Sequence, residues 1–224
     1  MMIPGPGDKR IVLINPNSAQ ATTDMMVAIA RGTTGDLSTI VGVTATRAPA
    51  MIVTPQELET SAEEVIELGL AQQPGCLGFI VSAFGDPGLE ALREKTGLPC
   101  TGLCEASMRA AHANGRRFGV ATVTPELTDA IAARARDLGF SSVYTGLRCT
   151  TGDPRALAAD AGRLRAELAE AVRACIARDG AEAVIIGGGP LGEAAADLQT
   201  MFSEPIIAPI PSAVLQLLGM IERR

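Results

Sequence analysis

The sequence predicts an α/β protein of two pseudo-symmetric Rossmann-like domains, each a mostly parallel sheet flanked by helices. Two observations predict this fold. Short apolar, β-branched runs alternate with longer Ala-rich segments of helical period, and three segments of the first half recur in the second half at offsets of 105 to 107 residues. With 47% hydrophobic and 20% charged residues, the 224-residue chain is neither a disordered tail nor a fibrous repeat.

The expected strands are short apolar runs bounded by turn residues. They lie at 11–15, 39–44, 77–82, 99–103, 117–122, 142–145, 183–187 and 205–209. Helices are expected between them, near 19–31, 55–72, 87–96, 105–114, 125–138, 154–179, 190–202 and 211–222. Four helix starts carry a capping side chain followed by proline at the first helical position: Thr54-Pro55, Asp86-Pro87, Thr124-Pro125 and Asp153-Pro154.

The internal duplication divides the chain into two halves. The matched pairs of segments are 11–18 with 118–125, 79–84 with 184–189, and 99–104 with 205–210. We therefore expect one domain at 1–114 plus 209–224 and a second domain at 115–208. Ligands of open α/β sheets bind outside the carboxyl ends of the strands, so the active site is expected in the cleft between the two domains.

The loops that follow the strands supply the candidate substrate-binding residues. Asn15, Asn17 and Ser18 could hold a carboxylate or ureide, although ordinary helix capping also explains them. Ser82 is expected to be a ligand donor rather than a nucleophile, because no base is visible beside it. The other expected binding residues are Ala83, Phe84, Thr122, Gly187, Gly188 and Gly189.

The segment GGGPLG at 187–192 fits the pattern of a dinucleotide-binding loop, but its surroundings do not. The acidic ribose ligand expected about 20 residues later is missing, proline occupies the turn, and only one strand follows. The loop therefore favours an anion or carboxylate pocket made by backbone amides over a nicotinamide nucleotide site.

Three residues are the candidates for acid and base chemistry. Cys104 is expected at the carboxyl end of a strand, with Glu105 beside it, and Asp86 lies in a predicted pocket loop. Two of them have another explanation, since Asp86 before proline is typical of a helix cap and Glu105 would be favoured by a helix dipole. The five cysteines form no CxxC pair and no zinc-like cluster, so neither a disulfide framework nor a metal site is expected.

Charge and hydropathy limit the expected partners. Nineteen Lys and Arg against 25 Asp and Glu give a net charge of −6, and the basic residues are scattered, so nucleic acid is not expected to bind. No apolar run reaches the roughly 20 residues of a membrane span, and the first residues lack a long apolar signal segment. We expect a cytoplasmic protein without a membrane partner. An Ala-rich, aromatic-poor surface suggests a homo-oligomer.

Five segments resemble the aspartate/glutamate racemase superfamily, and within it the hydantoin and allantoin racemase branch. They are INPNS at 14–18, AFGDPGLEALRE at 83–94, GLCEASMRAA at 102–111, RFGVAT at 117–122 and the glycine turn after 184–186. The resemblance implies a cofactor-independent enzyme of two pseudo-symmetric domains that moves a proton at a carbon next to a carbonyl or carboxylate. In that family a pair of cysteines, one from each half, removes and returns the proton.

The chain departs from this family at both cysteine positions. The first cysteine of the family falls at Ala83 and the second at Gly188. The sequence therefore predicts a racemase- or isomerase-like enzyme for a small hydantoin, ureide, amino acid or dicarboxylic acid, with Cys104, Glu105 or Asp86 supplying acid and base. The alternatives are a lyase, decarboxylase or hydrolase on the same scaffold, and a ligand-binding protein without catalysis.

Overall fold

The computed structural model describes residues 9–34, 39–189 and 191–224, which form two parallel four-stranded sheets. The first sheet has the order β2-β1-β3-β4 and the second the order β6-β5-β7-β8. The strands of the first sheet are β1 (Arg10–Asn15), β2 (Thr39–Thr44), β3 (Cys76–Val81) and β4 (Cys100–Gly102). Those of the second sheet are β5 (Phe118–Thr122), β6 (Tyr144–Cys149), β7 (Ala183–Ile186) and β8 (Ile206–Ile207). The matching strand orders confirm the predicted two-domain α/β architecture.

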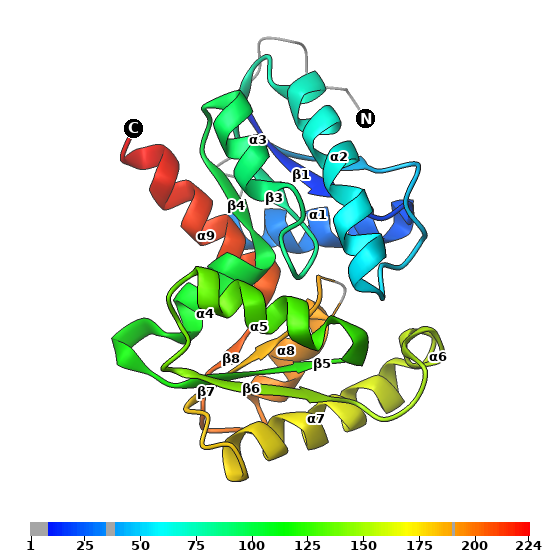
Figure 1. The fold of residues 1–224 in the computed structure, drawn as a ribbon, viewed down its shortest axis with the longest axis vertical. Helices are drawn as coiled ribbons and strands as arrows, with labels where there is room; N and C mark the ends of the chain where they lie inside the picture. Colours follow the sequence, from blue (N-terminus) through cyan, green and yellow to red (C-terminus); the bar gives the residue numbers. More distant parts are fainter. Residues whose placement is uncertain (1–8, 35–38, 190) are drawn as a thin grey trace.

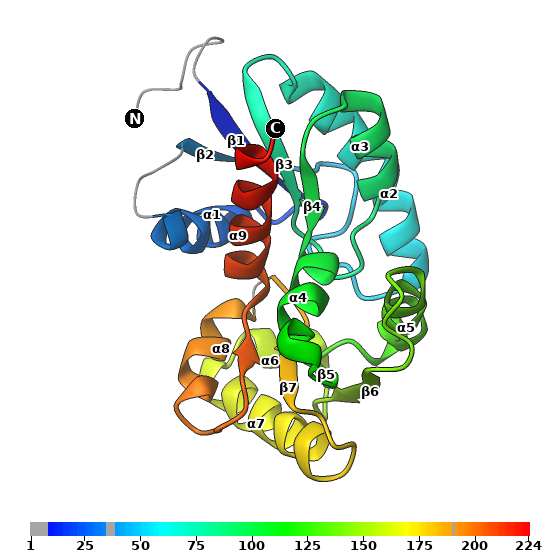
Figure 2. The same ribbon diagram turned by 90° about the vertical axis from the view of Figure 1, so that its left-hand side faces the viewer.

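Helices cover both faces of each sheet (Figure 1). On the first sheet, α1 (Gln20–Thr34) and α9 (Pro209–Glu222) lie on one face, and α2 (Pro55–Gln72) and α3 (Leu89–Thr96) lie on the other (Figure 2). The remaining helices are α4 (Leu103–Ala111), α5 (Thr128–Asp137), α6 (Pro154–Ala158), α7 (Ala161–Ala177) and α8 (Gly192–Gln199), with 3-10 turns η1 (Ala113–Gly115) and η2 (Pro125–Leu127). Within the described ranges, no helix has both the length and the apolarity of a membrane span.

Alternate residues of β1 face the two helical layers. Ile11 and Leu13 pack in the cluster that contains α1 and α9 residues, whereas Val12 and Ile14 pack with residues of α2 and α3. All four side chains are fully buried. A strand buried on both faces explains the continuous apolar run that predicted it.

One hydrophobic cluster runs through both halves of the molecule. Leu103 and Met108 of α4 belong to it, as do Phe118 of β5, Ile131 of α5 and Ile185 of β7. Helix α4 therefore packs between the two sheets and connects their cores (Figure 2).

The last helix returns to the first half. Helix α9 packs against α1, α4 and β3, although the chain reaches it from β8 of the second sheet. On this packing we propose the domain division 1–114 plus 209–224 and 115–208.

Two of the four expected proline-associated caps form. Thr54 accepts a hydrogen bond from the amide of Glu57, and Asp153 accepts from the amides of Arg155 and Ala156. Thr124 precedes the 3-10 turn η2 and its side chain makes no cap hydrogen bond. Asp86 does not cap the helix that follows it, because α3 begins at Leu89 after Gly88.

Other boundaries differ from expectation for local reasons. The helix expected over 154–179 is divided into α6 and α7, because the Asp160 side chain accepts the amide of Arg163 and starts a new helix. Strand β6 begins later and ends later than the expected 142–145. Pro190, where another helix was expected to begin, lies outside the described residues.

Candidate functional site

A cavity of about 280 Å³ lies where loops of the two halves meet. The first half contributes Ser82, Ala83 and Phe84, which follow β3, and the second half contributes Gly187 to Gly189, which follow β7. The polar side chains at the cavity are those of Asn17, Ser82 and Thr124. The apolar walls include Met25, Met51, Ile52, Leu58, Val123, Leu127, Leu164 and Leu191.

Seven of the ten expected binding residues line this cavity, and three do not. The lining residues are Asn17, Ser82, Ala83, Phe84, Gly187, Gly188 and Gly189. Asn15, Ser18 and Thr122, which were also expected at the site, are absent from the described cavity wall. Asn15 and Thr122 are fully buried and act on neighbouring loops instead.

Asn15 orients the loop that carries Asn17. Its side-chain nitrogen donates to Asn17 Oδ1 and to Thr23 Oγ1, each at 2.9 Å. Its side-chain oxygen accepts the amide of Asn17 at 3.1 Å. Asn17 Oδ1 also accepts the amide of Ala19 at 3.0 Å, so the Asn17 side chain lies in a fixed position at the cavity.

In each sheet, one hydroxyl group connects the two central strands. Ser82 Oγ, after β3, donates to the carbonyl of Ile14 in β1 at 2.7 Å. Thr122 Oγ1, at the end of β5, donates to the carbonyl of Gly187 after β7 at 2.6 Å. In each half, a hydroxyl group thus fixes a loop that reaches the cavity.

Two backbone amides of residues that line this uncharged site have no hydrogen-bond acceptor within the described part of the chain. In the hydrogen bonds among described residues, the amides of Ala83 and Phe84 donate to no acceptor. None of the described lining side chains is ionisable. Such amides can stabilise the oxygen of a carbonyl compound or of an enolate.

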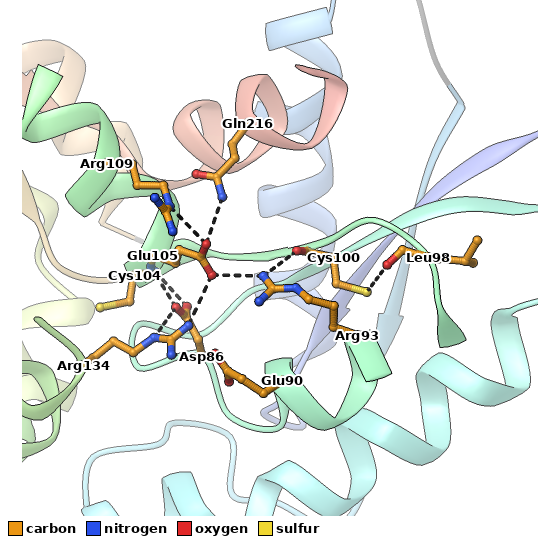
Figure 3. Close-up of polar contacts among 10 residues, drawn as sticks. All are labelled: Asp86, Glu90, Arg93, Leu98, Cys100, Cys104, Glu105, Arg109, Arg134 and Gln216. Carbon is orange, nitrogen blue, oxygen red and sulfur yellow. Dashed lines mark hydrogen bonds and ion pairs between the residues drawn. The ribbon is translucent and has the colours of Figure 1, made fainter. Parts of the chain in front are cut away.

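The three expected catalytic residues lie together but outside the described cavity lining (Figure 3). The Asp86 carboxylate accepts the amides of Cys104 and Glu105, each at 2.8 Å. Cys104 is in the first turn of α4 rather than at a strand end, because β4 stops at Gly102. Its side chain is fully buried in the core that connects the two halves.

The electrostatics of Cys104 and Glu105 do not suit the acid and base roles expected for them. Burial raises the pKa of the Cys104 thiol well above its ordinary value, so the thiolate is disfavoured. Burial also tends to raise the pKa of Glu105, but the hydrogen bond and charge of Arg93, followed by those of Arg109, hold it below its ordinary value. Glu105 is therefore an ionised partner of arginines rather than a proton donor at neutral pH.

Burial disfavours the thiolate form of the other cysteines as well. Burial raises the pKa of every cysteine thiol in the chain, to about 11 for Cys100 and about 12 for Cys175. Within residues 9–34, 39–189 and 191–224, no group of three metal-binding side chains comes together.

Sequence reasoning missed the apolar walls of the cavity and one arginine. Leu164 belongs to a helical apolar stripe that is typical of a core or subunit contact, and no sequence signal distinguishes it from one. Arg134 of α5 contacts Asp86 and Glu105 across the two halves, a relationship that only the folded chain reveals.

Comparisons with known proteins agree with this geometry. A hydantoin racemase of Pseudomonas sp. (strain NS671) is 30% identical over 213 residues, which cover 92% of this chain and 83% of that protein. The structure of allantoin racemase from Klebsiella pneumoniae superposes with a TM-score of 0.89 at 26% identity, covering 96% of this chain and 88% of that one.

A more distant structure shares the fold. Arylmalonate decarboxylase superposes with a TM-score of 0.67 at 21% identity, covering 95% of this chain and 92% of that one.

The profile of the Asp/Glu/Hydantoin racemase family matches residues 11–217, almost the whole chain. With the two-sheet fold and a cavity between its halves, the chain belongs to the Asp/Glu/Hydantoin racemase family.

Proposed function

We propose that the protein is a cofactor-independent isomerase that acts at the carbon next to a carbonyl in a small hydantoin, ureide or carboxylate. One observation carries the proposal: the turn with Ala83 and Phe84 and the turn with Gly187 to Gly189 line one cavity from opposite halves. A small ligand between them would be contacted on both faces. The family membership supports the same class of reaction.

The cavity lining favours an uncharged ring with an apolar substituent. Among the described lining residues there is no Lys or Arg to pair with a carboxylate, and burying an unpaired charge is costly. The amides of Ala83 and Phe84 are suited to a carbonyl oxygen, and Leu58 and Leu164 are suited to an apolar group. A hydantoin or ureide fits these features better than a dicarboxylic acid.

The mechanism must differ from exchange between two thiols. Ala83 and Gly188 carry neither acid nor base, and Cys104 is buried away from the cavity. We infer that the amides stabilise the enolate oxygen, and that the proton on the carbon leaves to water and returns from water. Without a positioned acid or base, which typically contributes about 10²- to 10⁴-fold, we expect a slow reaction.

A second candidate is ligand binding without turnover. The observation in its favour is the same uncharged lining, which places no proton carrier beside the ligand. A decarboxylase, lyase or hydrolase on this scaffold is the remaining alternative, in line with the fold shared with arylmalonate decarboxylase.

Two measurements on one panel of compounds distinguish these functions. Binding is measured by calorimetry, and deuterium incorporation at the carbon next to the carbonyl is measured in D2O, over hydantoins, ureides, amino acids and malonates. Deuterium in the recovered and otherwise unchanged compound supports the isomerase, and binding without exchange or product supports the second candidate. A new product supports bond cleavage, and a decarboxylation product would itself carry one deuterium from the solvent. A protein that binds none of the compounds would contradict the proposal.

A homo-oligomer in the cytoplasm, without nucleic acid or membrane partners, is the form that we expect. Light scattering during size exclusion measures the assembly directly.

A further inference from the structure

Six ionisable side chains form a cluster where the two halves meet (Figure 3). Its members, which we call the ionic cluster, are Asp86, Glu90, Arg93, Glu105, Arg109 and Arg134. Three carboxylates face three guanidinium groups, so their formal charges cancel. The cluster joins the loop after β3 to helices α3, α4 and α5.

The buried centre of the ionic cluster is the Asp86 carboxylate. Its side chain has 0% exposure, and its two oxygens accept the amides of Cys104 and Glu105 at 2.8 Å. These amides belong to the first turn of α4, where unpaired N–H groups favour a negative charge. Asp86 is thus an N-terminal cap for a helix that begins 17 positions later in the chain, at Leu103.

Arg134 connects the second half to this centre. Its Nε donates to Asp86 Oδ2 at 3.2 Å, its Nη1 to Glu90 at 2.7 Å and its Nη2 to Glu105 at 3.3 Å. Its side chain is only 12% exposed. The rigid fork of a guanidinium group suits several acceptors at fixed angles, so this single residue of α5 fixes α5 against α4 and the loop after β3.

The backbone of Asp86 connects the ionic cluster to the cavity. The Asp86 amide donates to the Ala83 carbonyl at 3.1 Å and closes a turn whose first residues, Ala83 and Phe84, line the cavity. Asp86 has a φ of 55°, in the left-handed region that non-glycine residues rarely adopt. Such a conformation costs of order 1–3 kcal/mol and persists where surrounding contacts fix it. Here those contacts are made by the carboxylate.

We propose that Asp86 and Arg134 are positioning residues that hold the turn at 83–86, and with it the cavity amides of Ala83 and Phe84, opposite the glycine turn at 187–189. The proposal rests on the proposed function, because the groups that it positions are those assigned to ligand binding. Neither residue is expected to contact the ligand, since both lie outside the described cavity lining.

The charge of Asp86 gives the proposal a pH dependence. Burial raises the pKa of Asp86 to about 6, while Arg134 and the amides of Cys104 and Glu105 act in the opposite direction. Protonation near that pH weakens the contact with Arg134, so ligand binding should weaken below about pH 6. The titratable or charged groups that face Asp86, directly or through these partners, are Cys104, Glu105 and Arg109 of α4, Glu90 and Arg93 of α3, and Arg134 of α5.

Three variants disturb the arrangement in different ways. Asp86→Asn keeps a residue type that tolerates the left-handed region, and one acceptor oxygen, but removes the charge. Arg134→Gln removes the guanidinium group that connects α5 of the second half to Asp86 and Glu105. Gly102→Ala changes no charge, but its methyl group would lie 2.2 Å from Asp86 Cγ and so displace the carboxylate. The control Arg148→Gln removes an arginine that pairs with Asp179 within the second half.

Hydrogen exchange tests the proposal independently of any ligand. The amides of residue 86, bonded to Ala83, and of Leu89, bonded to the residue 86 carbonyl, report on the turn. We expect at least tenfold faster exchange of these two amides in all three variants, and no change in Arg148→Gln. Unchanged exchange in both Asp86→Asn and Arg134→Gln would overturn the proposal.

Ligand binding is the second measurement, made by calorimetry with an apolar-substituted hydantoin between pH 5 and 7.5. At pH 7.5 we expect about tenfold weaker binding in the three variants, and in Asp86→Asn no transition near pH 6. An equal transition in the parent protein and Asp86→Asn would overturn the positioning role of the charge. If the parent protein binds no compound, the proposed function fails, and the exchange measurement still decides the role of Asp86 and Arg134.

Discussion

Ala83 and Gly188 line the same cavity, one after strand β3 of the first sheet and the other after strand β7 of the second. These are the two positions at which the resemblance to racemases places cysteine. The two positions therefore lie at one cavity, and neither residue has a side chain that can carry a proton. Substituting cysteine at both positions therefore tests directly whether they lie beside the reacting carbon.

Restoring both thiols should produce or raise racemisation. For Ala83→Cys with Gly188→Cys, we expect at least a hundredfold faster deuterium exchange on a bound hydantoin, because general acid and base groups typically contribute about 10²- to 10⁴-fold. Gly188 lies outside the left-handed region, and a Cβ there would meet the flexible Leu191 side chain at 3.0 Å. The backbone therefore permits the substitution. Exchange is measured by NMR in D2O with a reductant present.

The neighbouring glycine offers a control for this pair. A Cβ at Gly189 would lie 2.6 Å from Met26 Sδ, so Gly189→Cys should be destabilising and should not accelerate exchange when combined with Ala83→Cys. A double variant at 83 and 188 that folds and binds hydantoin, yet exchanges no faster than the parent, would show that these positions do not flank the reacting carbon.

The strands and the cavity loops were predictable from sequence because their causes are local. A buried parallel strand needs a continuous apolar run, and the carboxyl ends of such strands meet on one side of a sheet. Ala83 and Gly187 to Gly189, which follow two such strands, line one cavity. Sequence reasoning did not distinguish Asn17, which lines the cavity, from Asn15, which supports it from behind, because that difference depends on the path of one loop.

The role of Asp86 was not predictable because its partners are distant in the chain. An aspartate before proline is typical of a cap for the next helix, but this carboxylate caps α4 and pairs with Arg134, 48 residues away. Cys104 was misplaced for a related reason. Strand β4 contains only Cys100–Gly102 and leads directly into α4, so residue 104 is in a helix and within the core.

Asp86 should make the stability of the protein depend on pH. Burial raises the pKa of this group to about 6 from an ordinary value of 3.8, so the native state binds more protons than the unfolded state between these values. Its contribution to the free energy of unfolding should therefore fall as pH rises from about 4 to 6, by about 3 kcal/mol. Urea unfolding at intervals of pH measures this for the parent protein and Asp86→Asn.

The comparison with Asp86→Asn isolates this group from other carboxylates. Backbone hydrogen bonds lower the pKa of Glu57, and in Glu64 they outweigh the opposite effect of burial. These two glutamates therefore lose stabilising charge only as pH falls below about 4.5. Both glutamates are present in the parent protein and in Asp86→Asn. Parallel curves for the two proteins between pH 4.5 and 6.5 would contradict the assigned shift.

Leu164 should determine the preference for apolar substituents. It lines the cavity from α7 and is partly buried. In Leu164→Asn we expect about tenfold weaker binding of a hydantoin with an isobutyl or benzyl group, because about 1.4 kcal/mol of apolar contact is lost. Binding of unsubstituted hydantoin should change less than about twofold. Leu215→Asn is the matched control, since Leu215 is exposed on α9 and absent from the described cavity wall. Equal losses for both ligands would contradict this role.

The cap of α2 should contribute to the stability of the cavity wall. Thr54 Oγ1 accepts the amide of Glu57 at 3.2 Å, and Glu57 Oε2 accepts the amides of Val53 and Thr54 at 2.8 and 3.0 Å. Loss of such a cap costs about 1 kcal/mol, so Thr54→Ala should lower the free energy of unfolding by that amount. The measurement is urea unfolding at pH 7.

The control for this cap lies on the same helix. Thr60 is exposed and its hydroxyl donates to the Gln56 carbonyl inside α2, so Thr60→Ala removes a threonine hydroxyl without removing a cap. Alanine has the higher helix propensity, and we expect a change between zero and slight stabilisation. Since Leu58 lies on α2 and lines the cavity, Thr54→Ala should also weaken hydantoin binding, whereas Thr60→Ala should not. Equal effects of the two substitutions on stability and binding would show that the cap does not hold this wall in place.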